Sequence, residues 1–186
     1  MSEFTLYDEH NAPAQARDRL AAARKQMGFV PNLFAMMAEA PASLEAYQEL
    51  SRIFDTTSFS PVEREVVLLA TAVENRCHFC VAAHTGRAKK AGMAAADLDA
   101  LRAEAALPDA RLNALARFTR AVVRDRGWVG DEAVDAFLAA GFDRRQVLEV
   151  VLGVAIKTLS NYTNHVTGTP LNRELEPLAW EEAAQA

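Results

Sequence analysis

The chain has 186 residues, of which 51% are hydrophobic and 24% charged, a composition typical of a globular protein. Twenty Lys and Arg against 25 Asp and Glu give a net charge of −5, and the basic residues are dispersed, which argues against a nucleic-acid partner. No basic-then-apolar leader begins the sequence, and no apolar run is long enough for a membrane span. We therefore expect one cytoplasmic domain over residues 1–186, without a membrane partner.

Abundant alanine and sparse glycine favour helices, and the chain shows one helical pattern after another. A first amphipathic helix is expected over residues 13–27, ended by Gly28. A short helix through residue 38 follows, and Pro41 begins the next one, with apolar residues at helical spacing.

A capping box at Ser60-Pro61-Val62-Glu63 predicts the start of a further helix. Asn75 is a plausible cap for a second helix that begins near Arg76 and ends at Gly92. This interpretation places both cysteines of the chain near the first turn of that second helix.

The rest of the chain is also expected to be helical. The pattern predicts helices over residues 97–104, 109–127, 131–140 and 144–164, the last opened by a capping box of Asp143 and Gln146. A polar tail follows, with Trp180 as an anchor. The predicted fold class is all-α.

The two cysteines, Cys77 and Cys80, lie three residues apart, with His84 four residues further on. On a helix these positions share one side, so the three side chains can act together. In a reducing compartment such a pair is more often catalytic or metal-binding than a structural disulfide.

Nucleophilic chemistry requires a thiolate, yet a thiol with an ordinary pKa of about 8.5 is only a few per cent ionised at neutral pH. Three features favour ionisation here: the amide dipoles at a helix start, His84 one turn beyond Cys80, and Arg76 beside Cys77. Glu65 is a fourth candidate, because antiparallel packing of the two helices brings it towards His84, whose tautomer and basicity it would set.

The pattern of Glu65, eleven further residues, Cys77-x-x-Cys80 and x-x-x-His84 resembles the signature of the AhpD-like alkylhydroperoxidases, within the carboxymuconolactone decarboxylase superfamily. The segment over residues 27–34 resembles an N-terminal segment of the peroxidase-related branch of this family. Residues 161–171 resemble its C-terminal signature, so the likeness spans most of the chain.

The resemblance implies an all-helical homo-oligomer, often a trimer or hexamer, that reduces hydroperoxides with electrons from a dithiol donor. By position, Cys80 resembles the thiol that becomes a sulfenic acid, and Cys77 resembles the thiol that then forms a disulfide with it. His84 and Glu65 resemble the proton relay. We expect no haem, flavin, metal or other cofactor.

One departure from the family pattern concerns the residue before the second cysteine, which is Phe79 here and a histidine in AhpD enzymes. His78 lies one position earlier, about 100° around a helix, so it does not inherit that role. The decarboxylase branch generally lacks the cysteine pair, which argues against lactone decarboxylation.

Three alternatives remain open. Cys77, Cys80 and His84 could hold zinc with His78 or His165 as a fourth ligand, although no second pair at zinc-finger spacing is present. The cysteines could instead be small core residues of a structural or interaction protein. The relay could also act on a substrate other than a peroxide.

Overall fold

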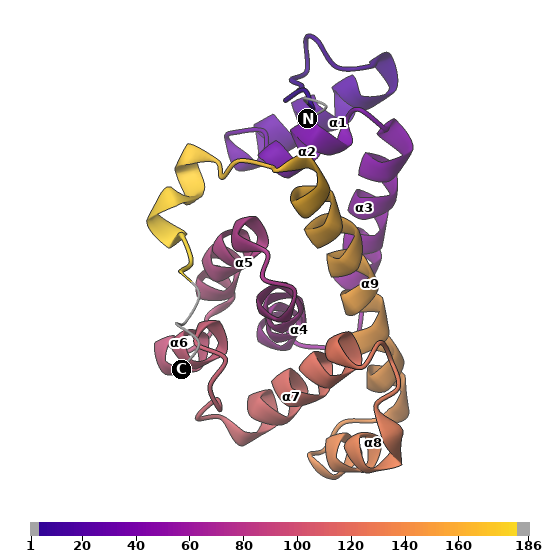
Figure 1. Ribbon diagram of the computed structural model, residues 1–186, viewed down its shortest axis with the longest axis vertical. Coiled ribbons are helices and arrows are strands. Elements are labelled where there is room, and N and C mark those ends of the chain that lie inside the picture. The colour runs from indigo at the N-terminus through magenta and orange to yellow at the C-terminus, as the bar shows by residue number, and fades with distance from the viewer. Residues whose placement is uncertain (1–3, 182–186) are drawn as a thin grey trace.

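The computed structural model describes residues 4–181, and within this range the chain forms helices without any β-strand (Figure 1). The elements are α1 (Ala14–Met27), α2 (Asn32–Met37), α3 (Pro41–Phe54), α4 (Pro61–Glu74), α5 (His78–Ala91), α6 (Ala95–Arg102), α7 (Ala110–Arg124), α8 (Gly130–Ala139), α9 (Arg144–Thr167) and a 3₁₀ helix, η1 (Arg173–Leu178). The all-α prediction is confirmed. None of the helices in this range is both long enough and apolar enough to cross a membrane.

Helix α4 lies at the centre of the molecule, with α5, α7 and α9 packed around it (Figure 1). Every residue from position 65 to 73 is buried, which is typical of a helix that is enclosed on all sides. The capping box predicted at Ser60 and Glu63 is present, so the start of this central helix follows from local sequence.

The long helix α9 crosses α4 at close range because Gly153 has no side chain. A Cβ atom at this position would lie 2.5 Å from Val67 Cγ1 and 3.0 Å from the ring of Phe54. The next turn of α9 is therefore held against the core, and it carries Lys157 into the interior.

The junction between α4 and α5 differs from the prediction. Asn75 ends α4 instead of capping α5, and Arg76 adopts a left-handed conformation with φ of 54°. Cys77 is the residue that precedes α5, and its backbone N–H bonds to Ala72 O at 2.9 Å. Cys80 then lies in the first turn of α5, close to the unpaired amides of the helix start.

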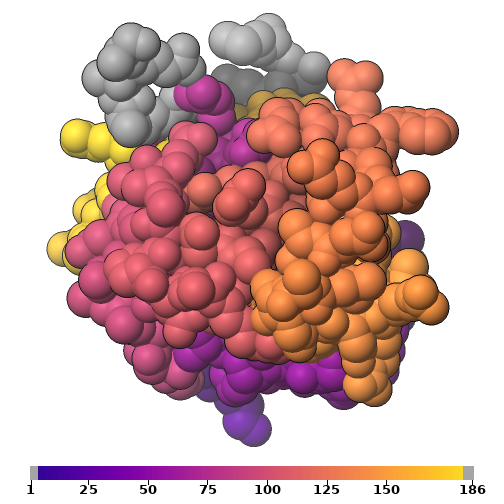
Figure 2. Space-filling model, turned by 90° about the horizontal axis from the view of Figure 1, so that it is seen from below, coloured from indigo at the N-terminus to yellow at the C-terminus, as the bar shows by residue number. Residues whose placement is uncertain are grey.

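The other predicted helices are present with ends shifted by a few residues, and α9 extends three residues beyond the predicted end. Helices α6, α7 and α8 lie side by side across one face (Figure 2). Trp180 is buried and its indole donates to Arg102 O at 2.9 Å, which confirms its prediction as an anchor.

Candidate active site

Three helices supply the polar side chains that meet inside the molecule. Helix α4 contributes Glu65, while α5 contributes residues spaced by one and two turns, which are Cys80, His84 and Arg87. Helix α9 faces them with Lys157, Ser160 and Asn164, again at helical spacing. All of them except Arg87 are buried.

Glu65 links α4 to α5 through both of its carboxylate oxygens. His84 Nδ1 lies 2.7 Å from Oε2, and Arg87 Nε donates to Oε1 at 2.9 Å. Glu65 is 5% exposed and His84 3%. Glu65 and His84 are thus in contact, as expected for antiparallel packing of α4 and α5.

Charges within the site set the protonation of this pair. Burial would raise the pKa of Glu65, but His84, Arg87 and Lys157 hold it below its usual value, so Glu65 is ionised. Burial and the charge of Lys157 lower the pKa of His84, while Glu65 opposes them. His84 is therefore neutral at neutral pH, with Nδ1 carrying the proton that it donates to Glu65.

Lys157 is the residue that the sequence interpretation missed. It is 1% exposed, and its Nζ lies 3.0 Å from His84 Nε2. The negative charge of Cys80 raises the pKa of Lys157 against the effect of burial. Its position one turn beyond Gly153, directly after the apolar run from residue 147 to 156, was the available signal.

The two sulfur atoms lie under α9, each cysteine being a free thiol and 1% exposed. Asn164 Nδ2 lies 3.3 Å from Cys80 Sγ and 3.5 Å from Cys77 Sγ. Ser160 Oγ lies 3.8 Å from Cys80 Sγ. These contacts hold the sulfur atoms close to one another.

The surroundings make the two thiols unequal. Burial would raise the pKa of Cys80, but the hydrogen bond from Cys77 and the charge of Lys157 lower it well below the ordinary thiol value. The same hydrogen bond to Cys80, followed by burial, raises the pKa of Cys77 far above that value. One thiolate, at Cys80, is therefore present beside one protonated thiol, at Cys77.

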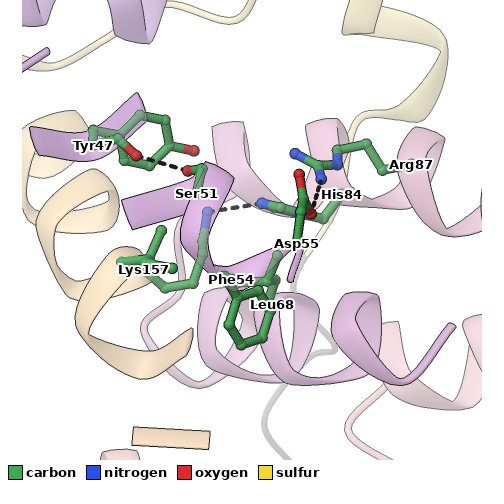
Figure 3. Close-up of a pocket in the computed structure, with 9 residues that line it drawn as sticks. Tyr47, Ser51, Phe54, Asp55, Leu68, His84, Arg87 and Lys157 are labelled. Carbon is green, nitrogen blue, oxygen red and sulfur yellow. Dashed lines mark hydrogen bonds and ion pairs between the residues drawn. The ribbon is translucent and has the colours of Figure 1, made fainter. Parts of the chain in front are cut away.

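A small pocket between α3, α5 and α9 reaches the site from outside (Figure 3). Its volume of about 10 Å³ is room for roughly one water molecule. Asp55 and Arg87 are exposed at its outer side, whereas His84 and Lys157 form its buried end. The remaining lining residues are Tyr47, Ser51, Phe54, Leu68 and Ile156.

The other two histidines considered in the sequence lie away from the thiols. The His78 ring packs against Trp180 with ring centroids 5.2 Å apart, and His78 Nδ1 lies 3.0 Å from Trp180 O. His165 is exposed beside Tyr162. The zinc alternative requires at least three His, Cys, Asp or Glu side chains placed to hold a metal ion. Within residues 4–181 no such group is found.

A comparison with known proteins finds one similar protein family. Residues 38–121 match the sequence profile of the carboxymuconolactone decarboxylase family, a range that contains Glu65, both cysteines and His84 but not Lys157. No curated protein sequence matches the chain.

Solved structures share the fold over nearly its whole length. The AhpD core of an uncharacterised peroxidase-related protein from Ralstonia eutropha JMP134 is 23% identical with a TM-score of 0.80, covering 94% of this chain and 96% of that one. A peroxidase-related protein from Silicibacter sp. TM1040 is 19% identical with a TM-score of 0.76, covering 94% and 95%. The debrominase Bmp8, in complex with 2,3,4-tribromopyrrole, is 14% identical with a TM-score of 0.77, covering 96% of each chain.

The profile match and the shared helical arrangement define an AhpD-like fold. Residues 38–121 are thus similar to the carboxymuconolactone decarboxylase family, and the chain shares its fold with the AhpD-like structures.

Proposed function

We propose that this protein is a thiol-dependent peroxidase, an oxidoreductase that reduces alkyl hydroperoxides through Cys80 and Cys77. The observation that carries the proposal is the inequality of the two adjacent sulfur atoms, one held as a thiolate and the other as a thiol. A thiolate supplies the nucleophile, and a neighbouring thiol supplies the group that closes a disulfide.

In the proposed reaction the Cys80 thiolate attacks the terminal oxygen of the hydroperoxide and becomes a sulfenic acid, while an alcohol leaves. The Cys77 thiol then condenses with the sulfenic acid, which releases water and forms the disulfide. A dithiol donor restores the pair by thiol–disulfide exchange. Glu65 and His84 form the proton relay beside Cys80, in which Glu65 accepts a hydrogen bond from His84 Nδ1 and orients the imidazole.

The experiment that tests this proposal is mass analysis of the intact protein after peroxide treatment. The wild type should lose two hydrogen atoms as a Cys77–Cys80 disulfide forms. Cys77→Ser should gain one oxygen at Cys80, trapped with a sulfenic-acid reagent, and Cys80→Ser, the matched control, should gain none. Two thiols that stay reduced in the wild type would overturn the proposal.

A second candidate follows from the fold shared with a debrominase, since a buried thiolate can also attack a halogenated carbon ring or the halogen itself. Bromide release from 2,3,4-tribromopyrrole in the presence of a dithiol tests it. Bromide release by protein whose thiols remain reduced under peroxide would favour this candidate over the peroxidase.

We also propose that the protein acts in the cytoplasm as a homo-oligomer, a trimer or hexamer. The support is a set of large apolar side chains that are exposed on one copy of the chain, which comprises Trp128, Leu148, Val151, Tyr162 and Val166. Exposed apolar side chains that lie close together mark a contact surface, and four of these five belong to α9. Sedimentation equilibrium gives the assembly size.

A further inference from the structure

We propose that Lys157 is the general acid of the site, and that its ammonium group protonates the oxygen that leaves when Cys80 attacks a hydroperoxide. This inference rests on the proposed peroxidase function. It assigns the proton transfer at the sulfur to a residue of α9 in place of His84.

The hydrogen bonds of the site favour Lys157 over His84 for this role. His84 Nδ1 is engaged with Glu65, and His84 Nε2 is engaged with Lys157 Nζ at 3.0 Å. The imidazole therefore has both of its nitrogens occupied. A lysine ammonium has three N–H donors, and one of them meets His84, which leaves donors for the nearby Cys80 sulfur and for an incoming oxygen.

Lys157 is placed where its ammonium group can donate a proton to an oxygen that leaves Cys80. Lys157 and His84 form the buried end of the pocket that opens between Asp55 and Arg87 (Figure 3). Lys157 also lies one helical turn before Ser160, whose Oγ is 3.8 Å from Cys80 Sγ. An oxygen displaced from the sulfur towards the pocket therefore meets the ammonium group. The pocket holds roughly one water molecule, so bulk solvent does not compete as the proton donor.

The proton count of the cycle closes around Lys157. As the S–O bond forms at Cys80 and the O–O bond breaks, the electron pair goes to the leaving alkoxide, which takes a proton from Lys157 and becomes the alcohol. The neutral amine then takes the proton of Cys77, whose thiolate forms the S–S bond. The S–O bond breaks, and the hydroxide recovers the proton from Lys157 as water. Reduction by a dithiol donor returns two electrons and two protons, which restore the Cys77 thiol, the Cys80 thiolate and the Lys157 ammonium.

The electrostatics of the site also support proton release at this step. Burial lowers the pKa of Lys157, and the negative charge of Cys80 is the largest effect that raises it. Once the thiolate has become a sulfenic acid, that charge is gone while the burial remains. The same reaction that creates the alkoxide thus makes the ammonium more acidic.

The test compares two reactions of the Cys80 thiolate that differ in their leaving group. Peroxide reduction expels an alkoxide, which needs a proton, whereas alkylation by iodoacetamide expels iodide, which needs none. Lys157→Arg keeps the positive charge but is a far weaker acid. We expect it to slow the reaction with tert-butyl hydroperoxide by about a hundredfold, the usual loss of a general acid. Alkylation should change by less than about threefold.

Lys157→Met removes both charge and proton, and it should raise the pKa of Cys80, which the ultraviolet absorbance of the thiolate reports. Rates compared at full ionisation should again be slow for peroxide and near normal for iodoacetamide. Lys90→Met, at an exposed lysine of α5, is the control for charge loss elsewhere. Methionine has a volume similar to that of lysine, and Lys157→Arg decides the question if the methionine variant is unfolded.

Two results would overturn the inference. Equal slowing of both reactions in Lys157→Arg would show that Lys157 only positions the thiolate. Full recovery of the peroxide rate at complete ionisation in Lys157→Met would show that it only sets the thiol pKa. A wild type that is alkylated at Cys80 yet inert to hydroperoxide would instead refute the proposed function, and with it this inference.

Discussion

The candidate site and the aromatic stack beside α7 and α8 are both buried, but opposite kinds of side chain fill them. In the stack, Phe137 lies between Phe118 and Phe142, with ring centroids 4.4 Å and 4.3 Å apart. Aromatic pairs of this kind add about 0.5–1.5 kcal/mol each beyond the burial of their area. In the site, Glu65 and Lys157 are enclosed charges, and buried charges contribute little net stability even when paired.

The contrast separates stability from chemistry. The aromatic stack stabilises the fold and has no group that can react, whereas the site holds reactive groups at a cost that the rest of the core offsets. Substitutions in the two regions should therefore have different consequences, and three predictions address this difference.

The largest expected effect is on stability at the aromatic stack. Phe137→Ala should lower the free energy of unfolding by about 3–5 kcal/mol, because it removes a fully buried ring and leaves a cavity. Urea unfolding measures the loss. The rate of peroxide reduction by the folded fraction should stay at the wild-type value, and a large change in that rate would mean that the two regions are coupled.

The next effect is on chemistry at Glu65. Glu65→Gln should slow peroxide reduction by about a hundredfold, or about 2.7 kcal/mol in activation free energy. A glutamine amide can donate to His84 Nδ1, which would move the ring proton to Nε2 and turn it against the Lys157 ammonium. Stopped-flow kinetics measure the rate.

Glu63 provides a matched control for this substitution. It lies on the same helix, is largely buried, and pairs with Arg111 at 2.9 Å, just as Glu65 pairs with Arg87. Glu63→Gln retains a side chain able to complete the capping box. Its peroxide rate should be unchanged, and equal slowing in both variants would indicate a general disturbance of α4.

The smallest effect concerns pH. Because the pKa of Cys80 is lowered on folding, its thiolate contributes stability that is complete above the unfolded value of about 8.5 and is lost as pH falls through the folded value. The stability of wild type relative to Cys80→Ser should therefore rise with pH up to about 8.5. Each unit of pKa difference corresponds to about 1.4 kcal/mol.

The ultraviolet absorbance of the thiolate provides an independent reading of the same prediction. At neutral pH the reduced wild type should show one thiolate. Cys80→Ser should show none, because burial, which the substitution leaves in place, still raises the pKa of Cys77. A thiolate that persists in Cys80→Ser would assign the nucleophile to Cys77.

Local signals in the sequence were sufficient for the helices. The capping boxes at Ser60 and Asp143 and the stop at Gly28 are contacts within one turn of the chain, and each is present where it was predicted. The prediction that Asn75 caps α5 was wrong, because the conformation of this junction depends on how α5 packs back on α4. The left-handed turn at Arg76 serves that packing.

The amino-acid sequence was enough to predict the helical fold class and the resemblance to the carboxymuconolactone decarboxylase family. It also predicted that Glu65, Cys77, Cys80 and His84 form one group, because their spacing lies within two adjacent helices. Only the tertiary structure showed that Lys157 lies beside them, since this residue is 73 positions beyond His84 in the chain and enters the site because Gly153 lets α9 approach α4. It also decided that the two thiols differ. Their charge states depend on burial and on Lys157, and the spacing of the motif predicts neither of these.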